Sequence, residues 1–225
     1  MNGFRRSRRA WAVLLGSFGM LMSATSAHAE PFSSLYLGFS LTSDSTYTIN
    51  GVAAPASLTC FSACSSTMAP SGGIRVGYWF ERLPWLGVAG DVSAFVASWG
   101  IQSPVEVVAY PITPLVAVRG RLIQQEGYPH GRVQPYLAIG PSLYVSTATV
   151  GSGWAALGTS SQASSTTADI GLDFRAGVEI LTTTWFGMLL EYRYTYAKPT
   201  WEIEGANYET ALSNNQFILG IVAHY

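Results

Sequence analysis

The sequence predicts an all-β fold: an eight-stranded antiparallel transmembrane β-barrel with short periplasmic turns and four external loops. Three observations predict this fold. The chain opens with an export signal, charged residues make up only 11% of it against about 25% in soluble domains, and the remainder alternates between apolar and polar residues in segments of about ten. No run of about 18 apolar residues follows the signal, so we expect strands to present apolar side chains to lipid at every second residue.

Residues 1–29 are expected to be a cleaved signal peptide, and residues 30–225 the barrel. Four arginines between positions 5 and 9 precede a short apolar stretch, and Ala27 and Ala29 supply the small residues that a signal peptidase requires before Glu30. Roughly 13 apolar residues are too few to span about 30 Å of hydrocarbon as a helix. The paired arginines also fit twin-arginine export, but a barrel must stay unfolded in transit, which favours the general secretory route.

Loss of the signal makes the chain acidic. The sequence contains 12 Lys and Arg and 13 Asp and Glu; four arginines leave with the signal, so 8 basic residues face 13 acidic ones, a net charge of −5. Lys198 is the only lysine. A nucleic-acid binder needs a basic face, which this composition cannot supply, so we expect no nucleic-acid partner.

Eight segments of the mature chain carry apolar residues on one face and small, polar or charged residues on the other. In order, they are residues 35–42, 74–80, 86–96, 107–122, 136–145, 170–179, 186–194 and 216–225. The first is apolar at odd positions, and the second and third are apolar at even positions, opposite Arg75 and Asp91. The fourth sets two valines against Arg119 and Arg121, although two prolines weaken its upper half.

The last four segments continue the alternation. The fifth and eighth are apolar at odd positions, whereas the sixth and seventh are apolar at even positions, opposite charged residues. An even number of strands places both termini on the periplasmic side. Short connections then fall near Leu83, Gly127 and Thr183, and long external ones at 43–72, 98–106, 147–168 and 197–213. An open soluble sandwich or a lipocalin is the alternative, but it would turn the charged face to water and the apolar face inward.

Three pairs of opposite charge are expected inside the barrel. If Leu83 and Thr183 are the centres of two short turns, the pairs lie opposite each other on the inward face of adjacent strands. The pairs are Arg75–Asp91, Arg175–Glu191 and Asp173–Arg193. Because the interior of an eight-stranded barrel is filled by side chains, we interpret them as a structural network; a charged ion path is the alternative.

Aromatic residues at the strand ends predict two girdles at the membrane interfaces. Those expected on the periplasmic side are Trp85, Trp185 and Tyr225, and those expected on the outer side are Trp99, Tyr110, Tyr196 and Trp201. A chance scatter of the 13% aromatic content is the alternative.

Several short motifs resemble those of a known family. They are Leu35-Tyr36-Leu37-Gly38, Gln134-Pro135-Tyr136 with Gly140-Pro141, Glu191-Tyr192-Arg193-Tyr194, and a last strand that ends in an aromatic residue. In this order and spacing they are similar to the OmpA/OmpX/opacity-type family of small outer-membrane barrels, over nearly the whole mature chain. The last strand is also similar to the signal read by the barrel-assembly machinery, which implies roles for Phe217, Leu219, Gly220, Ile221 and Tyr225.

Cys60 and Cys64 lie in the first external loop. An exported protein meets an oxidising compartment, so we expect a disulfide that closes a small local loop. A metal site would need further ligands and no histidine lies near, while a free reactive pair is the remaining alternative. We therefore expect no metal and no cofactor.

The histidines argue against catalysis. His28 leaves with the signal, and His130 and His224 are expected at the periplasmic side. Lipid-modifying barrels that act through Ser and His need the histidine near the outer leaflet, so we expect no catalytic residues here.

The external loops remain as the place of function. The resemblance implies roles that range from adhesion to envelope stability and lipid-A modification, so it does not fix one. We expect a non-catalytic barrel in the outer membrane that acts through these loops on a host or envelope partner, or stabilises the envelope. Its surroundings are outer-membrane lipid and lipopolysaccharide. A lipid-A or phospholipid-modifying enzyme and a narrow conduit for small apolar solutes are the alternatives, and a calcium site at the fourth loop's Glu202, Glu204 and Glu209 is another.

Overall fold

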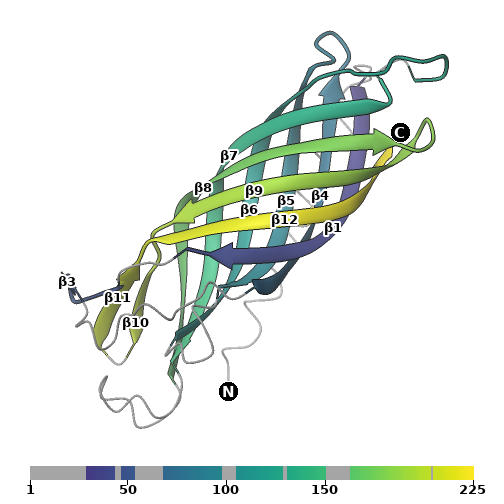
Figure 1. The fold of residues 1–225 in the computed structure, drawn as a ribbon. Coiled ribbons are helices and arrows are strands. Elements are labelled where there is room, and N and C mark those ends of the chain that lie inside the picture. Colours follow the sequence, from purple (N-terminus) through teal and green to yellow (C-terminus); the bar gives the residue numbers. More distant parts are fainter. Residues whose placement is uncertain are drawn as a thin grey trace, which may run out of the picture.

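Eight antiparallel strands close into a barrel, in the order β1-β12-β9-β8-β7-β6-β5-β4, which confirms the predicted fold class (Figure 1). The computed structural model describes residues 29–43, 47–53, 68–97, 105–128, 131–150, 163–203 and 205–225. Its strands are β1 (Ala29–Thr42), β2 (Tyr47–Ile49), β3 (Val52–Ala53), β4 (Met68–Phe80), β5 (Leu86–Ala97), β6 (Val105–Arg119), β7 (Val133–Val150), β8 (Ala163–Leu181), β9 (Phe186–Ala197), β10 (Thr200–Ile203), β11 (Ala206–Thr210) and β12 (Leu212–His224). No helix among the described residues is long and apolar enough to cross a membrane.

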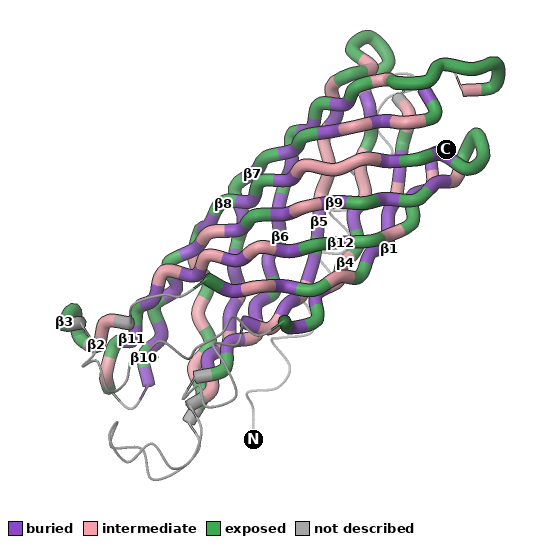
Figure 2. The backbone as a smooth tube through the Cα atoms, viewed as in Figure 1, coloured by how far each residue is buried: buried purple, intermediate pink, exposed green. Residues whose placement is uncertain are grey.

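The wall alternates between buried and more exposed residues along most of its length, with short runs of partly buried residues in β4, β5 and β8 (Figure 2). In β8, Leu172 and Phe174 are exposed whereas Asp173 and Arg175 are buried. Large apolar side chains therefore cover the outside of the barrel, and charged or polar ones fill its centre. This is the inverse of a soluble barrel and the pattern expected for one surrounded by lipid.

Two prolines interrupt the ladders of β6 without ending the strand. Its register with β7 pairs Ile112 with Leu143 and resumes only at Val116 and Ile139. Pro114 lies in this gap, and a proline has no N–H with which to donate a ladder hydrogen bond. The strand ends at Arg119, three residues earlier than the alternation predicts, and Leu122 forms only an isolated bridge with Val133.

A second, four-stranded sheet lies beyond the end of the barrel that carries the long connections. Its order is β10-β11-β2-β3, and in Figure 1 these strands project away from the C-terminus. The β7–β8 hairpin also continues past the barrel at this end, because β8 pairs with β9 only from Gly171 onward while its pairing with β7 begins at Ala163. Three of the connections expected as loops, 43–72, 147–168 and 197–213, are thus partly folded into strands.

The predicted signal peptide falls almost entirely outside the described residues, as do Cys60, Cys64, Trp99, His130 and Glu204. Ala29 opens β1 and Glu30 follows it within the strand. The cleavage before Glu30 and the Cys60–Cys64 disulfide therefore stay predictions.

Candidate functional site

Six charged side chains meet at the centre of the barrel. We call Arg75, Asp91, Asp173, Arg175, Glu191 and Arg193 the central ion cluster. All are buried, and they come from β4, β5, β8 and β9. The cluster holds three guanidinium and three carboxylate groups, so its formal charge is balanced. Balance matters here because a lone charge in a dry interior is costly.

Each acid of the cluster contacts more than one arginine. Arg175 Nη1 lies 2.7 Å from Asp91 Oδ2, and Arg175 Nη2 lies 2.8 Å from Asp173 Oδ2. Arg193 also forms an ion pair with Asp173, and its Nη1 approaches Asp91 Oδ1 to 3.6 Å. The cluster is consequently a network in which no two residues form an isolated pair.

The three predicted pairs are present in altered form. Arg75 lies opposite Asp91 in the ladder, with 3.4 Å between Nε and Oδ2, but its shorter contact is Nη2 to Glu191 Oε2 at 2.6 Å. The expected register between the sixth and seventh segments was wrong by two residues: Arg175 lies opposite Arg193. The Thr182–Trp185 turn is the reason, since the backbone N–H groups of Thr182 and Thr183 both donate to Phe186 O and so place the turn one residue later.

Two tyrosines support the cluster. Tyr36 donates a hydrogen bond to Asp91 Oδ2 at 2.7 Å, and Tyr136 donates one to Glu191. The Tyr136 ring also covers Gly177 on the neighbouring strand, where an added Cβ would lie 2.7 Å from the tyrosine hydroxyl. A missing side chain on β8 thus makes room for a ring that crosses the interior.

A second polar layer closes the periplasmic end. Arg119 forms an ion pair with Glu30, its guanidinium carbon lies 4.5 Å from the centre of the Trp79 ring, and it donates to Gln134 Oε1 at 2.9 Å. His224 lies between two acids, with Nδ1 2.8 Å from Glu30 Oε1 and Nε2 3.3 Å from Glu179 Oε2. His224 is on the periplasmic side as expected, but it is buried inside the barrel and bridges two strands' carboxylates.

An apolar layer fills the outer end. Trp201, Ile203 and Tyr208 of the β10–β11 hairpin are buried against residues of the barrel, and we call this group the outer apolar cluster. Its barrel members are Phe95, Ala97, Val107, Ala109, Tyr144, Ala148, Ala197 and Leu212. Trp201 is 1% exposed, and its Nε1 lies 3.4 Å from the carbonyl oxygen of Ser146, to which it donates. The prediction that Trp201 belongs to the outer girdle is therefore wrong.

Four other predicted girdle residues are exposed, as expected of an interface, whereas Tyr196 is only partly exposed and Trp99 lies outside the described residues. Trp85, Trp185 and Tyr225 project from the periplasmic end, and Tyr110 projects from the outer half. Trp201 lies in a connection that the sequence predicts to be a loop, but the structure folds this connection into β10. The buried-exposed alternation runs without a break from Phe186 through Ile203, and it puts Trp201 on the inward face.

The four-stranded sheet β10-β11-β2-β3, which we call the external sheet, turns a polar face outward. In the β10–β11 register Thr200 lies opposite Glu209 and Glu202 lies opposite Asn207, and all four are exposed. Within the described ranges, no group of three or more histidine, cysteine or carboxylate side chains is arranged to hold a metal ion. The face therefore offers hydrogen-bonding groups and two carboxylates in a fixed array.

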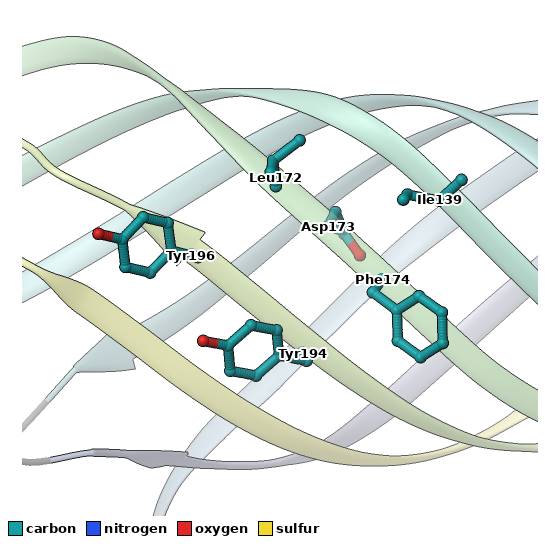
Figure 3. Close-up of a pocket in the computed structure, with 6 residues that line it drawn as sticks. All are labelled: Ile139, Leu172, Asp173, Phe174, Tyr194 and Tyr196. Atoms are coloured by element: carbon teal, nitrogen blue, oxygen red, sulfur yellow. The ribbon is translucent and has the colours of Figure 1, made fainter.

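A shallow depression of about 400 Å³ lies on the wall of the barrel (Figure 3). Ile139, Leu172, Phe174, Tyr194 and Tyr196 line it, from β7, β8 and β9, and Asp173 also borders it. The two tyrosine rings lie side by side on β9 in Figure 3, facing Leu172 and Phe174 in the next strand. Because these side chains share the outward face, the depression opens toward lipid.

The comparisons with known proteins agree with this architecture. Residues 12–224 match the family model described as "Outer membrane protein beta-barrel domain". Among solved structures, the chain is similar to neisserial surface protein A (NspA), with 16% identity, a TM-score of 0.56, and coverage of 87% of this chain and 97% of that one. It is also similar to OprG of Pseudomonas aeruginosa, with 13% identity, a TM-score of 0.58, and coverage of 88% and 96%.

At these identities the likeness to solved structures shows a shared fold. The comparison with curated proteins found no match. The family match extends over nearly the whole barrel, and the closed order of eight strands with apolar residues outward agrees with it. The chain thus belongs to the outer membrane protein β-barrel domain family.

Proposed function

We propose that this chain is a closed, non-catalytic barrel that acts through its external surface, in adhesion or other surface interaction, or in stabilising the envelope. The filled interior is the observation that carries the proposal. The periplasmic layer of Arg119, Glu30 and His224, the central ion cluster and the outer apolar cluster follow one another along the axis. Because side chains fill the interior, a function on the external surface is favoured over transport through the barrel.

The two alternatives find less support. A conduit needs an interior cleared of its ion pairs, and here the charged groups of the central ion cluster contact one another, the longest contact being 3.8 Å. A Ser/His lipid-modifying enzyme needs a histidine near the outer leaflet, whereas His224, the histidine that the structure describes, lies at the periplasmic end within 3.3 Å of Glu30 and Glu179. The same reasoning gives no catalytic role to the described residues.

The external sheet is the surface that fits an interaction role best. Its inward residues Trp201 and Tyr208 fix it onto the barrel, while Glu202, Asn207 and Glu209 face outward. A rigid sheet presents side chains at lower entropic cost than a free loop does. A polar, acidic array of this kind suits a basic or hydroxyl-rich partner surface.

Adhesion by whole cells tests the proposal. Cells that display the chain are compared with cells displaying the Glu202→Ala/Asn207→Ala/Glu209→Ala variant, on fibronectin, laminin and epithelial monolayers. The matched control is Glu81→Ala in an exposed periplasmic turn. We expect the triple variant alone to lose adhesion. Equal adhesion by all three strains, together with unchanged detergent resistance in a deletion strain, would remove both proposed roles.

The last strand supports a second proposal, about biogenesis. Phe217, Leu219 and Ile221 point outward from β12, and Tyr225 follows as the exposed terminal residue. An aromatic end with apolar residues at alternating positions is the pattern that the barrel-assembly machinery is expected to bind. Replacement of Tyr225 by Ala should lower the amount of folded protein in the outer membrane, while a Trp85→Ala control should leave it unchanged.

A further inference from the structure

A single basic residue stands above the depression on the barrel wall. Lys198 is the only lysine of the chain, and it directly follows β9 at the outer end. It shares the exposed face of Tyr194 and Tyr196, because the alternation continues through it to Glu202. The pairing of β8 with β9 ends at Gly171 and Ala197, one residue before Ile170 and Lys198, so Lys198 lies about 7 Å beyond the Leu172–Tyr196 pair along the strand.

The other basic residues of the mature chain lie elsewhere. They are the interior Arg75, Arg119, Arg175 and Arg193, and Arg82, Arg121 and Arg132 in the connections at the periplasmic end. Among the residues that the structure describes, Lys198 is accordingly the one cation at the outer end of an acidic chain. Lys198 lies at the outer edge of the apolar depression. The wall therefore presents apolar side chains first and a positive charge next, in the direction of the outer end.

Hydroxyl groups continue the strip outward. On the exposed face of the β7–β8 hairpin, Thr147 lies opposite Thr166 with 2.9 Å between their hydroxyl oxygens, and Thr149 lies opposite Ser164. Thr166 is four residues beyond Ile170 along β8, or about 13 Å. Exposed carboxylates, Glu106 opposite Thr149 and Glu202 on β10, flank this level and disfavour a further anion there.

We propose that this strip is a binding site for one phosphorylated glycolipid of the outer leaflet, the lipid A part of lipopolysaccharide. An acyl chain occupies the depression between Leu172, Phe174 and Tyr194. A sugar phosphate binds the Lys198 ammonium, and uncharged sugar hydroxyls meet Thr147 and Thr166. The site does not include the external sheet, so its test does not depend on the proposed adhesion role.

The order of apolar, cationic and hydroxyl side chains along the wall favours lipid A as the ligand. A lipid with an apolar tail, an anionic group at the interface and a sugar beyond it matches hydrocarbon, cation and hydroxyls in sequence. A phospholipid matches the first two but leaves the threonine pairs without a partner. Since the cation lies at a membrane surface, its loss should weaken binding about fivefold.

Native mass spectrometry of the full-length protein, with bisphosphorylated lipid A as the probe, tests the site. Lys198→Gln should lower lipid A retention about fivefold. Arg82→Gln, which removes an exposed cation at the periplasmic end, should leave it unchanged. Leu172→Trp, which fills the depression, should lower retention as well. Heat-dependent gel mobility shows that each variant is folded.

Two further probes define the ligand. Dephosphorylated lipid A should bind the native chain and Lys198→Gln equally, and phosphatidylglycerol should bind the native chain more weakly than lipid A. Equal lipid A retention by Lys198→Gln and the native chain, or an equal loss in Arg82→Gln, would overturn the site. Equal retention of phosphatidylglycerol and lipid A would overturn the assignment to a glycolipid.

Discussion

Removal of the charge of Asp173 should destabilise the barrel more than any surface substitution. Asp173 accepts hydrogen bonds from Arg175 Nε at 2.9 Å, Arg175 Nη2 at 2.8 Å and Arg193 Nε at 2.8 Å. Asp173→Asn keeps the size of the side chain but turns an amide NH₂ toward a guanidinium group. It also leaves three buried arginines with two carboxylates.

The expected magnitude follows from the burial of the pair. Loss of one partner from a buried ion pair typically costs about 3–5 kcal/mol, because the remaining charge is left uncompensated. Asp173 and both its arginines are fully buried, so we expect the free energy of unfolding to fall by about this amount. Asp91 is a less suitable site for this test, because three arginines share it.

Urea unfolding in phospholipid vesicles, followed by tryptophan fluorescence, measures the loss. Glu126→Gln, in the exposed connection between β6 and β7, is the matched control and should change stability by less than about 0.5 kcal/mol. Adding Arg193→Gln to Asp173→Asn should recover part of the loss, since it removes one unpaired charge. A loss below about 1 kcal/mol, or no recovery in the double variant, would refute the buried network.

The other predictions concern the wall, the external sheet and the first loop. The folded barrel should migrate faster on unheated than on boiled denaturing gels, and identical mobility would contradict a closed barrel. Trp201→Ala should make the β10–β11 hairpin sensitive to protease on intact cells while the heat-dependent mobility persists; an equally resistant hairpin would show that the outer apolar cluster does not hold it. Cys60 and Cys64 should resist alkylation until reduced, with an intact mass two hydrogens lower before reduction; immediate labelling would exclude their disulfide.

The wall was predictable from sequence because strand alternation has a period of two. Apolar residues at even positions of one segment, as at Leu172 and Phe174, fix which face meets lipid and which meets the interior. The same parity placed Arg75, Asp91 and Asp173 inside. In a membrane barrel, each residue's position in the alternation shows whether its side chain points inward or outward. The orientation of the wall residues can therefore be predicted without knowledge of contacts between distant residues.

Register was harder to predict than face. A shift of two residues between β8 and β9 leaves every side chain on its own face, so alternation cannot detect it. The structure pairs Arg175 with Arg193, and the charges are balanced by longer reach: Arg193 bonds Asp173 diagonally and Arg175 bonds Asp91 on another strand. Only the turn's hydrogen bonds to Phe186 reveal the true centre.

The external sheet could not be predicted from local pattern. It depends on Tyr208 pairing with Ile49, two residues far apart in the chain. The role of Trp201 was within reach, because the alternation that ends β9 continues into β10. In the sequence Lys198 is distinguished only as the single lysine; its place above the wall depression depends on the register of β8 and β9.

Electrical conductance across a planar bilayer tests the central claim, that the barrel is closed along its axis and works from its outer surface. The purified full-length chain should produce no steady conductance steps, because the periplasmic layer, the central ion cluster and the outer apolar cluster all fill the interior. Arg193→Gln/Asp173→Asn, which thins the central cluster, should open at most brief events. Regular, long-lived steps from the native chain would contradict the closed interior and return the function to transport.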